Sequence, residues 1–186
     1  MKRLKIALVV PNFNWSATKS VNTLWHYIPY NLCLLAAMIE DICDVVILDA
    51  YKSNMSQGEF RSELKNIKPD VVGITVLMDQ YASAGHIAAR ATKSVNKDIL
   101  VAIGGVYATT NTEGAIKDPN IDFVVIGEGE YVIRDLIKYC MKEGPIPLKG
   151  ICYRAGKKVI NTGHSDFIED LDALPLPAYH LIDFKK

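Results

Sequence analysis

Five short runs of apolar, largely β-branched residues recur along the chain, and each run is nearly continuous rather than alternating. They are Leu4–Val10, Val45–Leu48, Val71–Leu77, Ile99–Ile103 and Phe123–Ile126. Continuous runs of this length are typical of strands that are buried on both faces of a parallel sheet. This pattern constrains the fold more than any other feature, because helices have to cover both faces of such a sheet.

Apolar residues with helical spacing occupy segments between these runs, at 32–39, 87–95 and 132–140. Ser56 with Glu59, and Thr110 with Glu113, have the spacing of capping boxes and predict two further helix starts. Strand and helix therefore alternate from Leu4 to about Met141, with right-handed crossovers. We predict an α/β fold: a flavodoxin-like (Rossmann-like), doubly wound, five-stranded parallel sheet with strand order 2-1-3-4-5.

The character of the chain changes after Gly144-Pro145-Ile146-Pro147. Ile151–Arg154 and Val159–Thr162 flank a short polar turn, and this pattern predicts a β-hairpin. The segment 171–178 is punctuated by prolines, which is typical of an extended arm or linker. We therefore divide the chain into an α/β domain, residues 1–143, and a C-terminal β-hairpin with an extended arm, residues 144–186.

Charge and apolar runs exclude several classes of protein. The 21 basic and 21 acidic side chains give a formal net charge of zero, so nothing draws the chain toward nucleic acid or an anionic membrane. The run Ile6–Val10 is too short for a membrane span or the core of a secretory signal. The four cysteines match no metal or redox motif, and we expect them to be reduced: Cys33, Cys43, Cys140 and Cys152. We predict a soluble cytoplasmic protein.

Ligands of open parallel sheets bind beyond the carboxyl ends of the strands, so the loops that follow the strands matter most. The first loop, residues 11–29, is long, and its aromatic side chains suit either a flat apolar ligand or packing over the sheet edge. It contains Phe13, Trp15, Trp25, His26 and Tyr27. Gly104-Gly105 after the fourth run permits either close approach of a ligand or a tight turn. The carboxylates of Glu128 and Glu130 complement a helix N-terminus and disfavour phosphate there.

Several familiar sites are absent from the sequence. The G-x-G-x-x-G and G-x-x-x-x-G-K-[ST] motifs do not occur, and no serine stands in a G-x-S-x-G setting. Pro11-Asn12 and Thr75 occupy places where a receiver domain carries acidic residues. The histidines are scattered without acidic or cysteine partners at ligand spacing, and we expect His86 to be a half-exposed surface residue.

The combination of these loops resembles the N-terminal cobalamin-binding domain of B12-dependent radical SAM proteins. The segments that carry the resemblance are Pro29-Tyr30-Asn31-Leu32, Val46–Ala50, Lys68–Thr75, Ile103–Thr109, Asp122–Glu130 and Leu171–Ala178. They span nearly the whole chain in the right order. Two departures stand out: the cobalt-ligating D-x-H-x-x-G motif is missing, and Asn31 stands where many relatives carry glycine.

The resemblance implies that the domain holds cobalamin at the carboxyl edge of the sheet without a histidine ligand from that motif. The nucleotide tail would enter a channel beside strand four, and the corrin would lie against the aromatic first loop. The implied cofactor-binding residues are Asn12, Thr75, Val76, Leu77, Gly104, Gly105, Val106, Thr109, Gly127, Glu128 and Gly129. We assign no catalytic residue and no metal ligand within this chain.

The cluster motif C-x-x-x-C-x-x-C of radical SAM enzymes is also absent. The resemblance therefore implies that a [4Fe-4S] cluster and S-adenosylmethionine bind in a further C-terminal domain of a longer methyltransferase or cyclase. That domain and cobalamin are the expected partners, and the chain alone is not expected to be an enzyme. The alternative is a flavodoxin-like module without cofactor that acts in packing or partner binding.

Overall fold

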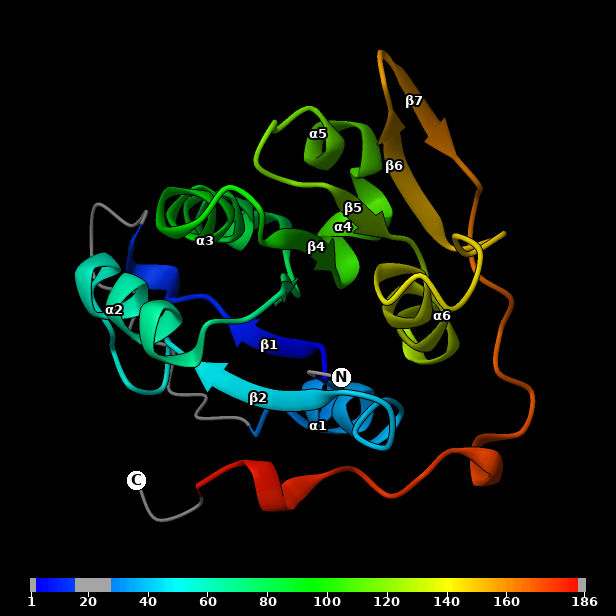
Figure 1. The fold of residues 1–186 in the computed structure, drawn as a ribbon, viewed down its shortest axis with the longest axis horizontal. Helices are drawn as coiled ribbons and strands as arrows, with labels where there is room; N and C mark the ends of the chain where they lie inside the picture. Colours follow the sequence, from blue (N-terminus) through cyan, green and yellow to red (C-terminus); the bar gives the residue numbers. More distant parts are fainter. Residues whose placement is uncertain (1–2, 16–27, 184–186) are drawn as a thin grey trace.

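The computed structural model describes residues 3–15 and 28–183, which form a mixed seven-stranded sheet with helices on both faces (Figure 1). The strands are β1 (Lys5–Val10), β2 (Asp44–Asp49), β3 (Val71–Thr75), β4 (Leu100–Gly104), β5 (Phe123–Val125), β6 (Ile151–Ala155) and β7 (Lys158–Asn161). Their spatial order is β2-β1-β3-β4-β5-β6-β7. Strands β1 to β5 pair in parallel in the order 2-1-3-4-5, as the sequence predicts.

The hairpin corrects the predicted strand count. Strand β6 pairs antiparallel with β5, with Val124 opposite Cys152, and β7 pairs antiparallel with β6. The sheet therefore has seven strands rather than five, because the hairpin covers the exposed edge of β5 instead of standing apart from the sheet. The hairpin signal lies in the turn between β6 and β7, which does not reveal the edge that the hairpin will join.

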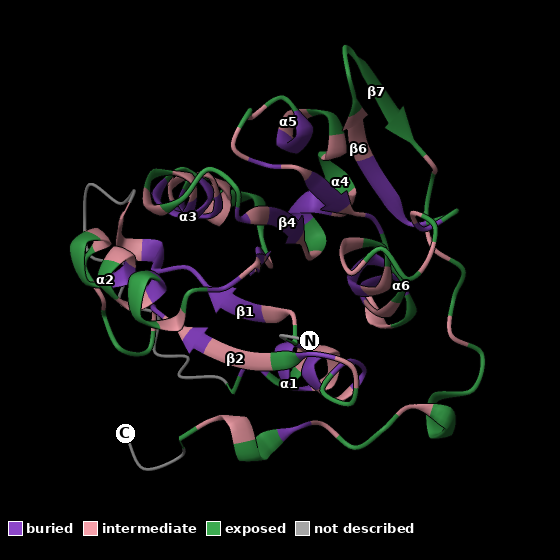
Figure 2. Cartoon of the chain, in the orientation of Figure 1, coloured by how far each residue is buried: buried purple, intermediate pink, exposed green. Residues whose placement is uncertain are grey.

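The helices form two layers around the sheet. They are α1 (Tyr30–Ala37), α2 (Gln57–Ile67), α3 (Ala82–Val95), α4 (Val106–Thr110), α5 (Thr112–Ile116) and α6 (Glu130–Cys140). Because side chains alternate along a strand, Ala7 and Val9 face the core under α2 and α3, while Ile6 and Leu8 face α1 and α6. Figure 2 shows this buried interior along the strands.

One of the two predicted capping boxes is present. Ser56 caps α2, accepting a hydrogen bond from the Glu59 amide, and the Glu59 carboxylate accepts one from the Ser56 amide. The prediction for Thr110 is wrong by one residue, since Asn111 caps α5 and accepts a hydrogen bond from the Gly114 amide. Thr110 is instead the last residue of α4, where its hydroxyl donates to the carbonyl of Val106.

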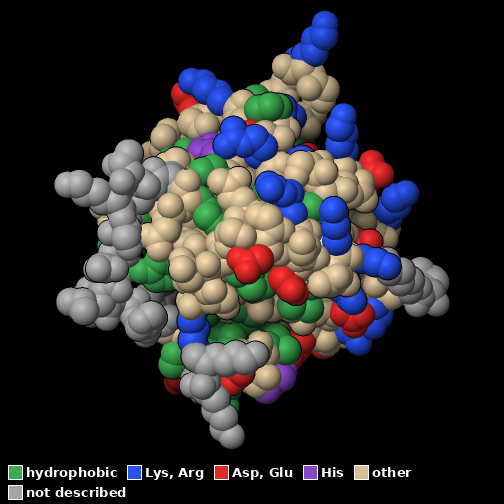
Figure 3. Space-filling model, turned by 90° about the vertical axis from the view of Figure 1, so that its left-hand side faces the viewer, with side chains coloured by type: hydrophobic (Ala, Val, Ile, Leu, Met, Phe, Trp, Pro, Cys, Tyr) green, Lys and Arg blue, Asp and Glu red, His purple; other side chains and the backbone are tan. Residues whose placement is uncertain are grey.

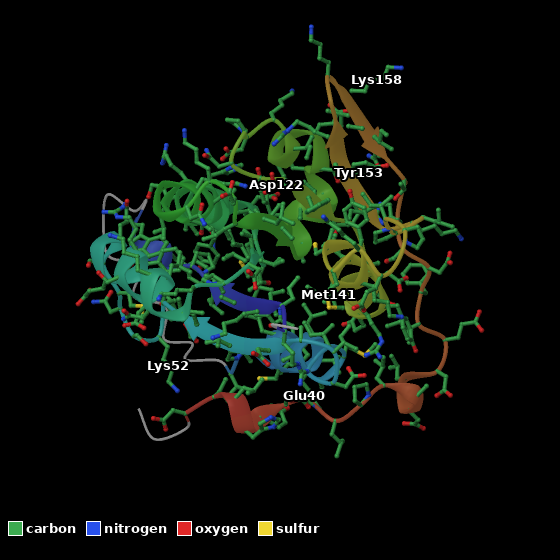
Figure 4. All side chains as sticks on the ribbon, viewed as in Figure 1. Glu40, Lys52, Asp122, Met141, Tyr153 and Lys158 are labelled. Atoms are coloured by element: carbon green, nitrogen blue, oxygen red, sulfur yellow. The ribbon has the colours of Figure 1, made fainter. Side chains whose placement is uncertain are left out.

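The C-terminal arm is extended, as predicted, and lies along α1 (Figure 1). The Ala178 amide donates to the carbonyl of Cys33 at 2.9 Å, and Ala178 is buried. Two side-chain contacts add to this: His180 lies 3.1 Å from Glu40, and Lys52 donates to the Asp183 carbonyl. Figure 4 labels Glu40 and Lys52 beside the arm. The arm therefore packs on the α/β domain, while the division at residue 143 stays a prediction.

The cysteines are free thiols, as predicted. Cys33, Cys43 and Cys152 are buried, and Cys140 is partly buried. Burial raises the pKa of all four thiols, to about 11 for Cys43 and Cys140. Among residues 3–15 and 28–183, no helix is both long and apolar enough to cross a membrane.

Candidate functional site

A cavity of about 200 Å³ lies between the sheet and the two helices α1 and α6. Its floor contains alternate residues of β3, namely Val71, Gly73 and Thr75, which share one face of the strand. Residues of β1 and β4 extend the floor on either side, and Ile133 and Ile137 of α6 contribute to the opposite wall. The cavity therefore follows the strand direction from the carboxyl edge of the sheet to the beginning of β3.

Small residues make room on this floor. Gly73 and Ala102 lie side by side on β3 and β4, and Gly104 follows at the carboxyl end of β4. A Cβ atom built on Gly104 would have one close neighbour, the Cβ of Val125, at an ordinary contact distance of 3.7 Å. A dry cavity of about 150 Å³ can hold a benzene ring, so this one has room for a ring-sized group.

The turn after β4 depends on Gly105. Its φ is +93°, and a Cβ there would lie 2.6 Å from the carbonyl oxygen of Val76. That carbonyl accepts a hydrogen bond from the Tyr107 amide, while the Val76 amide donates to the carbonyl of Gly104. The turns after β3 and β4 are therefore bonded to each other, and only glycine fits where they touch.

The turn after β5 forms the other side of the cavity entrance. Gly127 has a φ of +83°, and its amide donates to the Thr109 hydroxyl at 2.9 Å. The Glu128 carboxylate accepts a hydrogen bond from the Ile168 amide at 2.6 Å and so holds the C-terminal segment in place. Glu130 also lines the cavity. One of its carboxylate oxygens is buried and has no hydrogen-bond partner among the described residues.

One residue of α1 reaches across the cavity to β3. The side-chain amide of Asn31 donates a hydrogen bond to the Thr75 hydroxyl at 3.1 Å, and both residues line the cavity. In the sequence, Asn31 stands out only as a departure from the family pattern. Gly73 was also missed, although a glycine inside a strand is a signal of close backbone approach.

Six of the predicted cofactor-binding residues line the cavity: Thr75, Gly104, Gly105, Gly127, Glu128 and Gly129. The other five are not part of its lining: Asn12, Val76, Leu77, Val106 and Thr109. Asn12 is buried and donates to Asn54 and to the Met55 carbonyl. Val76 is buried in the core on the opposite face, whereas Val106 is 55% exposed. Their predicted roles toward a cofactor stay predictions.

The described part of the aromatic first loop packs onto the protein. Phe13 stacks on Tyr81 with ring centroids 4.1 Å apart. The Trp15 indole donates to the Met55 carbonyl at 2.7 Å and packs against Phe60 of α2. The sequence left two alternatives open for this loop, a flat apolar ligand or packing over the sheet edge. The rings of Phe13 and Trp15 pack over the sheet edge. Trp25, His26 and Tyr27 lie outside the described residues.

His86 is partly exposed, as predicted, but it does have an acidic partner. Its Nδ1 lies 2.7 Å from the Asp118 carboxylate, and its Nε2 lies 2.8 Å from the Tyr107 hydroxyl. Burial raises the pKa of Asp118, but hydrogen bonds from Asn120 and His86 outweigh this and leave the pKa below its ordinary value. The sequence distance between His86 and Asp118 hid this contact. Residues 3–15 and 28–183 contain no group of three side chains placed to hold a metal ion.

The face toward which β1 and β2 point carries acidic side chains near its centre, with hydrophobic side chains beside them (Figure 3).

The B12 binding domain family matches residues 18–137 of the chain, which include both glycine turns of the cavity. The chain belongs to the B12-binding domain family. This membership confirms the predicted type of domain.

Relatives of this B12-binding domain are longer proteins. An uncharacterised methyltransferase of Pyrococcus horikoshii is 30% identical over 188 residues, a match that covers 100% of the chain and 40% of the relative. The anaerobic magnesium-protoporphyrin IX monomethyl ester cyclase of Rubrivivax gelatinosus is 31% identical over 150 residues, 77% of the chain and 26% of the cyclase. The chain therefore spans less than half the length of these relatives.

Solved structures share the fold of this B12-binding domain. The cobalamin-dependent S-adenosylmethionine radical enzyme OxsB, with aqua-cobalamin and S-adenosylmethionine bound, matches with a TM-score of 0.75 at 21% identity, over 95% of this chain and 24% of OxsB. The radical S-adenosylmethionine methyltransferase TsrM from Kitasatospora setae, with cobalamin and a [4Fe-4S] cluster bound, matches with a TM-score of 0.72 at 18% identity, over 95% of this chain and 31% of TsrM.

Proposed function

We propose that this domain holds cobalamin at the carboxyl edge of its sheet, with the nucleotide tail in the cavity beneath α1 and α6. The observation that carries the proposal is the ring-sized cavity that follows β3 and is floored by Gly73, Ala102 and Gly104. When bound, cobalamin would supply the reactivity of its cobalt, and the protein would supply binding and orientation.

The residues of the cavity fit such a tail. Its deeper part is apolar, with Ile6, Val71 and Ile137 among its walls, and suits the flat face of an aromatic base. Its entrance is polar at the Thr75 hydroxyl. A volume of about 200 Å³ is too small for the whole corrinoid, so the corrin would remain outside, over the sheet edge.

The two glycine turns would position the cofactor. Gly104 and Gly105 bring the backbone next to the entrance without side chains, and the Gly127–Gly129 turn borders the opposite side. The bond between Thr109 and Gly127 fixes the distance between these turns. No histidine is found among the described residues that line the cavity, so we propose no protein ligand for cobalt at this site.

We also propose that the domain serves a longer radical SAM methyltransferase or cyclase, in which a [4Fe-4S] cluster and S-adenosylmethionine bind elsewhere. The names of the relatives support a methyltransferase or cyclase, and the match covers 40% or less of their length. The radical SAM chemistry is supported by the likeness to OxsB and TsrM. Residues 144–186 would then connect the cofactor-binding domain to the rest of the enzyme. A cytoplasmic location belongs to the same proposal, supported by the four free thiols, which fit a reducing compartment.

The test is a titration of the purified chain with hydroxocobalamin. We expect a saturable change in the visible absorbance of the corrinoid and a rise in melting temperature. At a ligand concentration 100 times the dissociation constant, binding should stabilise the fold by about 2.7 kcal/mol. No spectral change together with an unchanged melting temperature would refute cobalamin binding and favour the module without cofactor.

A further inference from the structure

The hydrogen bond between Asn31 and Thr75 lies where a ligand would enter the cavity. A helix that follows a parallel strand runs back along the sheet, so the N-terminal turn of α1 lies at the carboxyl edge. Asn31 is the second residue of α1, and Thr75 is the last residue of β3. A ligand that comes from the carboxyl edge meets this contact first. The rest of the cavity floor, as far as Val71, lies beyond it.

The two partners differ in their surroundings. Asn31 is partly exposed, so its amide can turn to water when the bond breaks. Thr75 is 5% exposed, and its hydroxyl accepts the bond from Asn31. Breaking the bond therefore clears the path along the floor.

We infer that Asn31 acts as a latch across the cavity entrance and controls how fast a corrinoid with a nucleotide tail can enter. This inference rests on the proposed function and adds a positioning residue that the family match does not assign. A corrinoid without the tail would not pass the latch. Asn31 would therefore affect the two kinds of corrinoid differently, which a purely structural role would not.

The size of the effect follows from the energy of one neutral hydrogen bond. Such a bond contributes about 1 kcal/mol net, which corresponds to about a fivefold change in a rate or equilibrium constant. Removing the latch should therefore speed the association of a tail-bearing corrinoid by about fivefold, provided that the bond breaks before the tail enters.

The experiment measures association rates by stopped-flow absorbance for wild type, Asn31→Ala, Thr75→Val and the double variant. Asn31→Ala removes the donor and keeps a helix-forming residue at the second position of α1. Thr75→Val removes the acceptor of the same hydrogen bond, and valine has almost the same shape as threonine. The two single variants therefore test the latch independently. Each protein is mixed with hydroxocobalamin and, as the control ligand, with cobinamide, which lacks the nucleotide tail.

We expect hydroxocobalamin to associate about fivefold faster with each single variant. The double variant should be no faster than either one, because both substitutions remove the same bond. Cobinamide should associate at one rate with all four proteins. Melting temperatures measured without ligand show whether each variant is folded.

Three results would overturn the latch. Wild-type rates in both folded single variants would show that the bond does not limit entry. Slower association or weaker binding after Asn31→Ala would make Asn31 a ligand contact rather than a latch. An equal acceleration for cobinamide would mean a general loosening of α1. Failure of hydroxocobalamin to bind any of the four proteins would instead refute the proposed function on which the latch depends.

Discussion

The backbone amide of Gly127 donates a hydrogen bond to the hydroxyl of Thr109 over 2.9 Å. Thr109 belongs to the short helix α4 that follows the Gly104-Gly105 turn, and Gly127 begins the turn after β5. The two glycine turns that border the cavity are therefore fixed to each other by one side chain. Thr109 does not line the cavity, but it determines the relative position of residues that do.

Replacing Thr109 tests this connection. Thr109→Val removes the acceptor and leaves the exposed Gly127 amide to water, so we expect the free energy of unfolding to fall by about 0.5–1 kcal/mol. Affinity for hydroxocobalamin should fall as well, because the turns lose their fixed spacing. The control is Thr109→Ser, which keeps the hydroxyl and should stay close to wild type in urea unfolding and titration. Equal values for the valine and serine variants would contradict the role of the hydroxyl.

The adjacent glycines Gly104 and Gly105 should respond differently to alanine. At Gly105 the φ is positive, and a Cβ would lie 2.6 Å from the Val76 carbonyl oxygen. We therefore expect Gly105→Ala to lower the free energy of unfolding by about 1–3 kcal/mol. At Gly104 the nearest neighbour of a Cβ is 3.7 Å away, so Gly104→Ala should change stability much less. Thermal or urea unfolding of both variants gives the comparison. A Gly105→Ala protein as stable as Gly104→Ala would show that the turn is not as tight as described.

The sequence predicts the parallel part of the sheet well, because continuous apolar runs separated by helical stripes leave few arrangements. It also finds the loops that matter, since carboxyl-end loops can be identified once the strands are placed. The resemblance to cobalamin-binding domains then implies particular residues in these loops, and six of them line one cavity. The pairing of the hairpin with β5 was not predicted, because it depends on which edge of the folded sheet is left uncovered.

Two features of the cavity lay beyond sequence reasoning. Ala102 contributes to the floor because the register of β3 and β4 places it beside Gly73, and register is a property of the assembled sheet. Asn31 contacts Thr75 across 44 positions of sequence, so no local spacing could reveal the bond. The aromatic first loop left two alternatives open, and the rings of Phe13 and Trp15 follow the one in which they pack on neighbouring elements.

Acid should weaken the contact between α6 and the segment after α1. Both Arg134 amino groups donate to the Asp41 carboxylate at 2.7 Å, and one also donates to the Met38 carbonyl. The hydrogen bond from Arg134 lowers the pKa of Asp41 in the folded protein. A carboxyl whose pKa is lower when folded stabilises the protein above its unfolded pKa, and this stability is lost as the pH falls through the folded pKa.

Asp41→Asn isolates this pH effect. Because the Asp41 side chain is well exposed and that of Arg134 is partly exposed, we expect the variant to lose no more than about 1 kcal/mol at pH 7. The difference from wild type should shrink as the pH falls from about 5 to 2, when the wild-type carboxyl also becomes neutral. Urea unfolding across this range measures the gap. A gap that stays constant or widens at low pH would contradict the role of the ion pair.

The thiols should react slowly in the folded protein. Burial raises the pKa of Cys43 and Cys140 to about 11, so at pH 8 only about one molecule in a thousand carries the reactive thiolate at either site. We expect Ellman's reagent at pH 8 to label the native chain slowly and to label all four cysteines at once in denaturant. Rapid labelling of all four in the native state would contradict their burial.

The central claim, that the cavity receives the nucleotide tail of cobalamin, is tested most directly at Gly104. A Cβ fits at this position, so Gly104→Ala should fold and bind hydroxocobalamin within a few-fold of wild type. The indole of Gly104→Trp would project from the floor of the cavity and block the tail, so we expect its affinity to fall by at least about tenfold, or 1.4 kcal/mol. Equilibrium dialysis of both folded variants gives the two dissociation constants. Weaker binding by the tryptophan variant alone is the predicted result, and equal affinity of the two variants would contradict the claim.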